Sequence, residues 1–180
     1  MREITAMKPE YLQASLDLVE QVFTEHENAG EGKLVRRLVE EIRSKKYYLP
    51  GLELLMLEDS APVGYAMFSR FHIGGRHDER LLLLSPVAVR TDRQRQGISR
   101  ELIEYGFVKA RELGFTAVLV EGNPANYRAR GFVTSVDHGI VAAPSVHLPH
   151  PGCLMVKELT PGGLCGITGE VEYSVYGALC

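Results

Sequence analysis

The sequence predicts a mixed α/β (α+β) fold in which a mostly antiparallel central sheet is flanked by helices. A continuous apolar run at residues 81–89 has the composition of a strand that is buried on both faces. After a polar loop, residues 97–113 carry apolar side chains at the spacing of one helical face. Other strand-like and helix-like segments surround this pair, and their order favours one sheet with helices packed against it.

The N-terminal part should contribute one strand and two helices. Residues 2–7 should form the strand, and an apolar face at helical spacing follows them. Gly30 and Gly32 should end the first helix, so that a second helix begins near Lys33. The acidic segment 25–32 is then a flexible loop, which is either solvated or in contact with a substrate amine.

The middle of the chain predicts a hairpin next to the central strand. Residues 52–58 and 63–71 have strand composition, and the turn-forming residues 59–62 separate them. A polar insert then leads the chain into the central strand at residues 81–89. We therefore expect three adjacent antiparallel strands.

Shorter elements follow the long helix. Residues 117–120 should form a buried strand, and residues 125–130 one or two helical turns before a further strand that starts at Phe132. Residues 154–159 should be the last strand. The glycine-containing tail at residues 161–180 should be a loop with one edge pairing at most.

Length and composition are those of a globular protein. The 180 residues and 20.0 kDa fit one domain over residues 1–180, with a core in about residues 1–160 and a C-terminal tail at 161–180. The chain is 45% hydrophobic and 24% charged, without low-complexity segments. A net charge of -3 and a pI of about 6.1 argue against nucleic acid as a partner.

Several other classes of protein are disfavoured. The N-terminus has no apolar signal core and no run approaches the roughly 20 apolar residues of a membrane span, so we expect a cytoplasmic protein without a membrane partner. The six histidines are scattered without helical pairing, so no metal site is expected. An odd number of cysteines without a C-x-x-C pair argues against disulfides and structural zinc; they are Cys153, Cys165 and Cys180.

The junction between the central strand and the long helix should attract an anion. The first turn of a helix has backbone N–H groups without an intrahelical partner and the positive end of the helix dipole. Gly97 lacks a Cβ, so a phosphate oxygen could approach the main chain, and Ser99 adds a hydroxyl. The alternative is a plain turn with a solvated basic surface. The neighbouring cations are Arg90, Arg93, Arg95 and Arg100.

Two segments carry a resemblance to a known family. Residues 94–99 read QRQGIS after a V-A-V strand end, and this resembles the acetyl-CoA loop of the GNAT superfamily of N-acetyltransferases, R/Q-x-x-G-x-G/A. Residues 123–132 read NPANYRARGF and resemble the family segment in which a tyrosine precedes a Gly-Phe pair by four residues. Two motifs in the family's order are far more specific than one.

The resemblance implies a GNAT-like fold with acetyl-CoA as cosubstrate. Main-chain groups at the end of the central strand would bind the pantetheine arm. A family bulge, with which Pro86 is compatible, would separate this strand from residues 117–120 and open a slot. The asparagines of the second motif would contact the pantetheine or serve as turn residues. The implied cofactor-binding residues are Val87, Ala88, Val89, Gln94, Arg95, Gln96, Gly97, Ile98, Ser99, Asn123 and Asn126.

Tyr127 carries over as the candidate general acid. A phenol pKa of about 10 lies near the value of about 8.5 for an alkyl thiol, so it can protonate a departing thiolate. The alternative is a tyrosine that packs against the cofactor or orients its sulfur. The general base stays open, because residues 84–86 read LSP where some family members have a glutamate. Glu121, Glu25, His72 and a chain of waters are the alternatives.

The resemblance implies transfer of acetyl by direct attack of a primary amine on the thioester. The acceptor would be a small molecule or a peptide. A protein that modifies the N-termini of other proteins differs only in this acceptor. The alternative from another class is a non-catalytic acyl-CoA-binding sensor or interaction module. Whether the chain works as a monomer or as a homodimer stays open.

Overall fold

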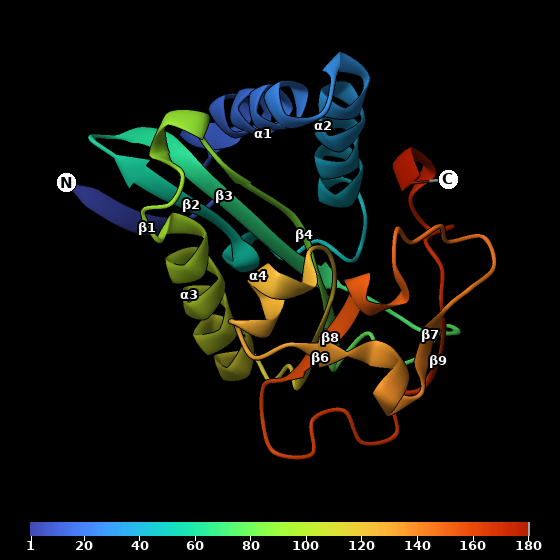
Figure 1. Ribbon diagram of the computed structural model, residues 1–180. Coiled ribbons are helices and arrows are strands. Elements are labelled where there is room, and N and C mark those ends of the chain that lie inside the picture. The colour runs from blue at the N-terminus through green and yellow to red at the C-terminus, as the bar shows by residue number, and fades with distance from the viewer. Residues whose placement is uncertain (180) are drawn as a thin grey trace.

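A seven-stranded sheet organises the protein, and the computed structural model describes residues 1–179 of it (Figure 1). Within this sheet, as far as residues 1–179 show, only β4 and β5 pair in parallel; the other neighbours are antiparallel, so the predicted mixed, mostly antiparallel sheet is confirmed. In spatial order the strands are β1 (Arg2–Ala6), β2 (Glu53–Glu58), β3 (Ala61–Arg70), β4 (Leu81–Val89), β5 (Ala117–Glu121), β8 (Leu154–Glu158) and β6 (Val133–Thr134).

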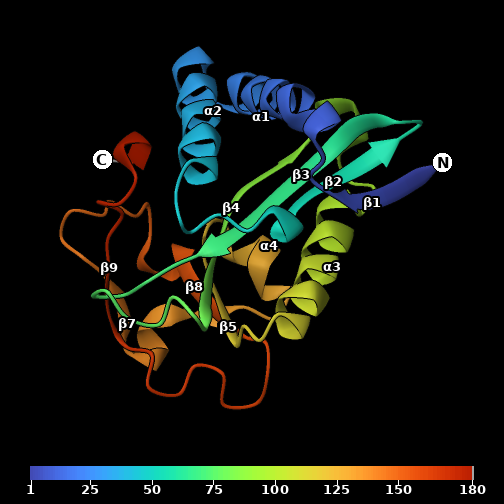
Figure 2. The same ribbon diagram turned by 180° about the vertical axis from the view of Figure 1, so that it is seen from behind.

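Helices cover both faces of the sheet, two on each (Figures 1 and 2). The faces have separate cores because neighbouring residues of a strand point in opposite directions. In β2, Leu55 and Leu57 pack toward α1 and α2, whereas Leu54 and Met56 pack toward α3. Each such buried side chain contributes about 1.5–3 kcal/mol relative to an exposed one. The helices are α1 (Leu12–His26), α2 (Ala29–Arg43), α3 (Ile98–Glu112) and α4 (Pro124–Arg128).

The sheet opens between β4 and β5. The two strands pair only over Leu81–Leu83 and Ala117–Leu119. On its other side, β4 advances three residues where β3 advances two, so β4 carries one extra residue at Ser85 or Pro86. Such a bulge bends the strand that contains it. The expected departure of β4 from β5 is therefore confirmed, and the second half of β4 has a free edge.

The boundary between α1 and α2 differs from the sequence prediction. The second helix starts at Ala29 and not near Lys33, so most of the segment 25–32 is helical instead of a flexible loop. Asn28 explains the start, because its side chain accepts a hydrogen bond at 2.9 Å from the backbone N–H three residues later. This cap replaces one of the missing intrahelical bonds of the first turn.

Gly32 serves helix packing and does not break the helix. A Cβ at this position would lie 2.0 Å from Oγ1 of Thr24 and 2.6 Å from the carbonyl oxygen of Glu20. Both of these residues belong to α1. The absence of a side chain thus allows α1 and α2 to approach each other closely.

The C-terminal tail belongs to the core of the α1/α2 face. The predicted last strand is followed by β9 (Gly169–Val171), which pairs in parallel with β7 (Ile140–Ala142) as a second, small sheet. The strand expected at residues 154–159 is present as β8, and β9 is the single edge pairing that was expected of the tail, so β8 is not the last strand of the chain. Tail side chains that are buried are Leu164, Ile167, Val171 and Tyr176.

Two further observations concern membrane-spanning helices and thiols. In residues 1–179, no helix has both the length and the apolar composition of a membrane span. Cys153 and Cys165 are free thiols, and Cys180 lies outside the described residues.

Candidate active site

The connection between β4 and α3 combines an unusual backbone with an open helix start. Arg95 and Gly97 have φ angles of 61° and 81°, in the left-handed region. Gly97 directly precedes α3 and has no side chain with which to cap it. The N–H groups of the first turn are therefore available to an anion. A Cβ on Gly97 would meet no heavy atom within 4 Å, so the space beside this glycine is open.

A cavity of about 510 Å³ lies at this connection, and we call it the β4–α3 cavity. It is lined by the end of β4, the loop after it, the first turn of α3, the last turn of α1 and α4. Because α1 and α3 cover opposite faces of the sheet, the cavity has walls from both faces beside the half of β4 that has separated from β5. A slender ligand could thus cross from one face of the sheet to the other.

Most of the residues that the sequence suggested for the cofactor come together here. Two do not. The Gln96 side chain accepts a hydrogen bond from the guanidinium of Arg2, and Asn123 caps α4 by accepting one from the Ala125 N–H at 3.0 Å. Asn123 is therefore a turn residue, the second of its two predicted roles. Those that line the cavity are Val87, Ala88, Val89, Gln94, Arg95, Gly97, Ile98, Ser99 and Asn126.

The four arginines that the sequence places near the loop are not equivalent. Arg93 lines the cavity, but its guanidinium is paired with Glu58 at 2.6 Å and Asp92 at 3.1 Å. Arg90 pairs with Asp92 at 2.6 Å and does not line the cavity, and neither does the exposed Arg100. Both pairs are partly open to water, since the Arg93 side chain is 31% exposed, so water screens them and Arg93 could exchange a carboxylate for a phosphate.

The last turn of α1 lines the cavity, and its apolar residues are ones that the sequence did not reveal. Val22 and Phe23 have the spacing of a core-facing helix surface, and nothing in their pattern separates a cavity wall from a core. His26 stands with its Nε2 atom 2.7 Å from the side-chain nitrogen of Gln94. Only the fold brings this turn to the loop, so sequence spacing carried no signal for it.

Tyr127 lies in the same cavity, on α4. Its half-buried ring meets Phe132 edge-on at 5.5 Å between centroids. The ring also covers Gly122, where a Cβ would lie 2.5 Å from a ring carbon. Burial raises the pKa of Tyr127, and the nearby Arg130 offsets part of that rise. The hydroxyl therefore stays protonated at neutral pH and can donate a proton.

Comparison with known proteins agrees with these features. The sequence profile of the Acetyltransferase (GNAT) family matches residues 17–136, more than half of the protein. The chain belongs to the GNAT acetyltransferase family. The resemblance inferred from the two motifs is thus confirmed.

Two relatives from Escherichia coli K12 illustrate the similarity. The "Uncharacterized N-acetyltransferase YhbS" is 29% identical over 140 residues, which cover 76% of this chain and 79% of the relative. The "Uncharacterized N-acetyltransferase YjhQ" is 31% identical over 144 residues, which cover 79% and 77%.

Solved structures share the fold of this GNAT protein. The crystal structure of Escherichia coli YhbS in complex with CoA has a TM-score of 0.81 at 26% identity and covers 96% of this chain and 89% of its own. A GNAT family acetyltransferase from Brucella melitensis in complex with acetyl-CoA has a TM-score of 0.75 at 24% identity and covers 100% and 99%. At that lower identity, the likeness shows the fold alone.

Two of the three side chains considered as a general base line neither the β4–α3 cavity of this GNAT protein nor a second cavity, which is described below. Glu25 accepts hydrogen bonds from Thr91 and from Gln21, and the bond from Thr91 is the main reason why the pKa of Glu25 is lowered. The Nδ1 atom of His72 accepts a hydrogen bond from the Gly75 N–H at 3.1 Å. Neither side chain is among the described residues that line either cavity.

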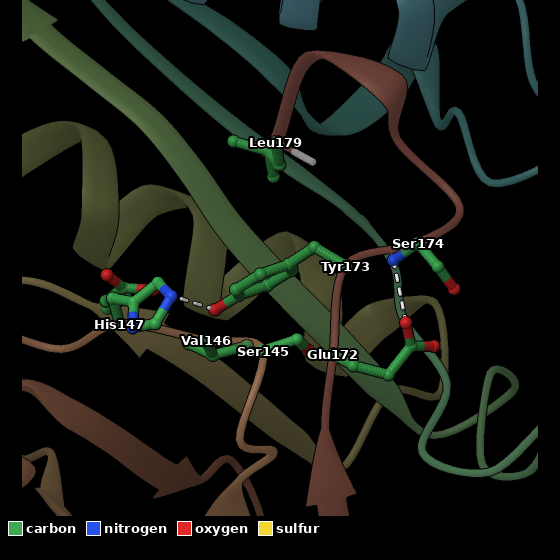
Figure 3. Close-up of a pocket in the computed structure, with 8 residues that line it drawn as sticks. Ser145, Val146, His147, Glu172, Tyr173, Ser174 and Leu179 are labelled. Carbon is green, nitrogen blue, oxygen red and sulfur yellow. Dashed lines mark hydrogen bonds between the residues drawn. The ribbon is translucent and has the colours of Figure 1, made fainter.

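Glu121, the third candidate, lines a second cavity of about 600 Å³, which we call the β5 cavity. Figure 3 shows this cavity from close by. Glu121 is the last residue of β5, and the residues two and four positions before it pack on the α1/α2 face. Its side chain therefore belongs to that face. The other walls come from the segment after β7 and from the tail after β9. The geometry thus retains Glu121 and a water chain as candidates.

Proposed function

We propose that this protein is an acetyl-CoA-dependent N-acetyltransferase that acts on a primary amine of a small molecule or peptide by direct attack. The observation that carries the proposal is the β4–α3 cavity. It joins an anion-attracting helix start, the free edge of β4 and the Tyr127 side chain across an opening in the sheet. The CoA complex of the similar YhbS protein supports the same cofactor class for this chain.

The residues present fit the cofactor. A pyrophosphate needs backbone N–H groups without partners and room to approach the main chain closely. The start of α3 provides the N–H groups, and the missing side chain of Gly97 provides the room. The pantetheine arm carries amide groups that need hydrogen-bond partners. Beyond Leu83, the β5 side of β4 offers backbone N–H and C=O groups that the described strands leave unpaired. Arg95 and Arg130 add positive charge to the lining.

Each part of the site has a separate task in the proposed reaction. Acetyl-CoA, when bound, supplies an acetyl group on a thioester whose sulfur departs as a thiolate. The loop and the free strand edge hold the donor in place, and such positioning can lower a barrier by about 7–11 kcal/mol. Tyr127 donates its proton to the departing sulfur. General acid catalysis of this kind raises the reaction rate by about 10²- to 10⁴-fold.

Two measurements test the proposal. Calorimetry should detect binding of acetyl-CoA, and release of free thiol should follow the addition of a suitable amine from a panel. Binding without thiol release on any amine would favour the acyl-CoA-binding sensor instead. Absence of binding of every CoA ester tried would remove both readings.

A further inference from the structure

We propose that the β5 cavity is the acceptor site and takes a primary amine carried on a small apolar body, with Glu121 as the group that receives the amine. The proposal rests on the acetyl-transfer function above and adds a substrate class and a residue to it. Four observations support it: the position of the cavity, the residues that line it, the hydrogen bonding of Glu121, and the hydrogen bonds that hold the tail against α2.

The two cavities lie on opposite sides of one short segment. Glu121 points to the α1/α2 face, where it lines the β5 cavity. The next residue, Gly122, is covered by the Tyr127 ring, which lines the β4–α3 cavity. This segment follows β5 directly, on the side where β4 and β5 have separated. An amine beside Glu121 therefore lies next to the route by which a donor crosses the sheet.

The lining of the β5 cavity selects charge and polarity. Val146, Tyr173 and Leu179 give it an apolar surface, and Glu172 gives it a carboxylate (Figure 3). Glu121 adds a second carboxylate. Among the described residues that line it, none is a lysine or an arginine. A cationic or neutral amine on an apolar body complements this surface, whereas an acidic acceptor would be repelled.

The β4–α3 cavity has the opposite character. Three arginines line it, namely Arg93, Arg95 and Arg130. A polyphosphate is thus favoured in one cavity and an amine in the other. The charge separation gives each cavity a different ligand even though the two lie close together.

Glu121 is oriented for an amine by its neighbour. The Tyr173 hydroxyl donates a hydrogen bond to Oε2 of Glu121 at 3.0 Å. Burial, and then the charge of Glu121, raise the pKa of Tyr173 far above its usual range, so this hydroxyl keeps its proton. The ring of His147 points toward the same hydroxyl (Figure 3). Oε1 of Glu121 has no hydrogen-bond donor among residues 1–179, so it can accept one from an amine.

The second carboxylate of the cavity is already engaged. Oε2 of Glu172 accepts a hydrogen bond from the Ser174 N–H at 2.8 Å, and this bond is the first cause of the lowered pKa of Glu172. Glu172 therefore shapes the local turn of the tail and adds negative charge. Glu121 is the carboxylate that remains for the acceptor.

The tail wall of the cavity is held by α2 (Figures 1 and 2). The Glu41 carboxylate accepts hydrogen bonds from the Gly177 and Ala178 N–H groups at 2.8 and 3.1 Å. The Lys45 ammonium donates one to the Val175 carbonyl at 2.5 Å. These bonds fix the segment that carries Tyr173 and Leu179, so the cavity is present before a ligand arrives.

The proposed step balances without another reactant. The amine reacts in its uncharged form; a bond forms between its nitrogen and the acetyl carbon while the bond between that carbon and sulfur breaks. The nitrogen then carries a surplus proton and is strongly acidic, so the Glu121 carboxylate is basic enough to take it. Tyr127 gives its proton to the sulfur. Exchange with water returns a proton to Tyr127 and removes one from Glu121, which leaves an amide and a thiol.

The test compares Glu121→Gln with Glu170→Gln. Glu170 is an exposed carboxylate on β9 outside both cavities, so it controls for loss of negative charge on the tail side. For the wild type we expect kcat/KM for thiol release to be at least about tenfold higher with phenethylamine than with glucosamine or glutamate. Glu121→Gln should lower the value for phenethylamine by at least about 10²-fold. The acetyl-CoA affinity of Glu121→Gln should match that of the wild type. Glu170→Gln should match the wild type both in kcat/KM and in acetyl-CoA affinity.

Calorimetric titration of phenethylamine into each protein in the presence of CoA separates binding of the amine from its reaction. Binding and thiol release that are both lost in Glu121→Gln would support the acceptor site. Binding without thiol release in the wild type, thiol release that Glu121→Gln leaves intact, or a preference for glucosamine or glutamate would overturn the acceptor site. The transferase function fails separately, only if no amine of the panel causes thiol release.

Discussion

Tyr127 has a ring that packs and a hydroxyl that stays protonated, and the two can be tested separately. Replacement of Tyr127 by Phe keeps the edge-on contact with Phe132 and the cover over Gly122. We expect thiol release to fall by about 10²- to 10⁴-fold, because proton delivery to the sulfur is lost. The affinity for acetyl-CoA, measured by calorimetry, should change less than about twofold.

The matched control is Tyr105→Phe. Tyr105 lies on α3 outside both cavities, with the Lys109 ammonium over its ring. This variant should keep wild-type turnover. Full activity in Tyr127→Phe would leave Tyr127 the packing role that the sequence also allowed.

Gly97 should be essential for binding of the donor. Its φ of 81° disfavours any side chain, and a side chain would also project into the open space beside the loop. We therefore expect Gly97→Leu to weaken acetyl-CoA binding by more than about tenfold. Isothermal calorimetry on the folded variant measures this change.

Gly114→Leu separates backbone strain from loss of binding. Gly114 follows the other end of α3 with a φ of 91°, and a Cβ there also meets no atom within 4 Å. Both variants should lose a similar amount of stability, whereas only Gly97→Leu should lose affinity. Equal affinities in the two variants would contradict a pyrophosphate site at Gly97.

At the scale of elements, the contact between α1 and α2 depends on one missing side chain. Gly32→Ala would place a Cβ 2.6 Å from the carbonyl oxygen of Glu20, which cannot move without moving α1. We expect a loss of about 1–3 kcal/mol in the free energy of unfolding, measured by urea denaturation. Because α1 also lines the β4–α3 cavity, acetyl-CoA affinity should fall as well.

Gly51→Ala is the control for that change. A Cβ at Gly51 meets no atom within 4 Å, so its stability should stay within about 0.5 kcal/mol of the wild type. Equal stability of the two variants would mean that α1 and α2 adjust to the methyl group without loss.

Elements with a strong local pattern could be predicted from the sequence. The apolar run of β4 and the helical spacing of α3 lead to the observed bounds within a residue. The end of α1 could not be predicted in the same way, because Gly32 is read as a helix breaker until the facing helix is known. The three-residue strands β7 and β9 are equally invisible, since neither is long enough to show alternation.

The candidate site also has parts that could be predicted from the sequence and parts that could not. The loop around Gly97 and the segment around Tyr127 are contiguous motifs, so the sequence led to both. The last turn of α1 and the pair of Glu121 with Tyr173 could not be found, because the pair joins residues 52 positions apart. Only the packing of the tail against the α1/α2 face brings such residues together.

Across the whole molecule, one buried carboxylate connects the helical layer to the sheet. Glu53 on β2 is 0% exposed and accepts hydrogen bonds from the Tyr48 and Tyr65 hydroxyls, both at 2.5 Å. Arg43 of α2 donates to the same carboxylate at 2.9 Å and reaches the Ser15 hydroxyl of α1 at 2.8 Å. Hydrogen bonds around the single negative charge of Glu53 therefore connect α1, α2 and β2.

Removal of that charge should destabilise the fold without touching either cavity. In Glu53→Gln, the guanidinium of Arg43 would stay mostly buried without its counter-ion, and loss of one partner of a buried pair costs about 3–5 kcal/mol. Asp17→Asn breaks the exposed pair with Arg36 and should cost less than about 1 kcal/mol. Urea denaturation of both variants measures the difference. Adding Arg43→Met to Glu53→Gln should restore part of the stability, because no unpaired charge then remains in the core; equal losses in the single and double variants would contradict this account.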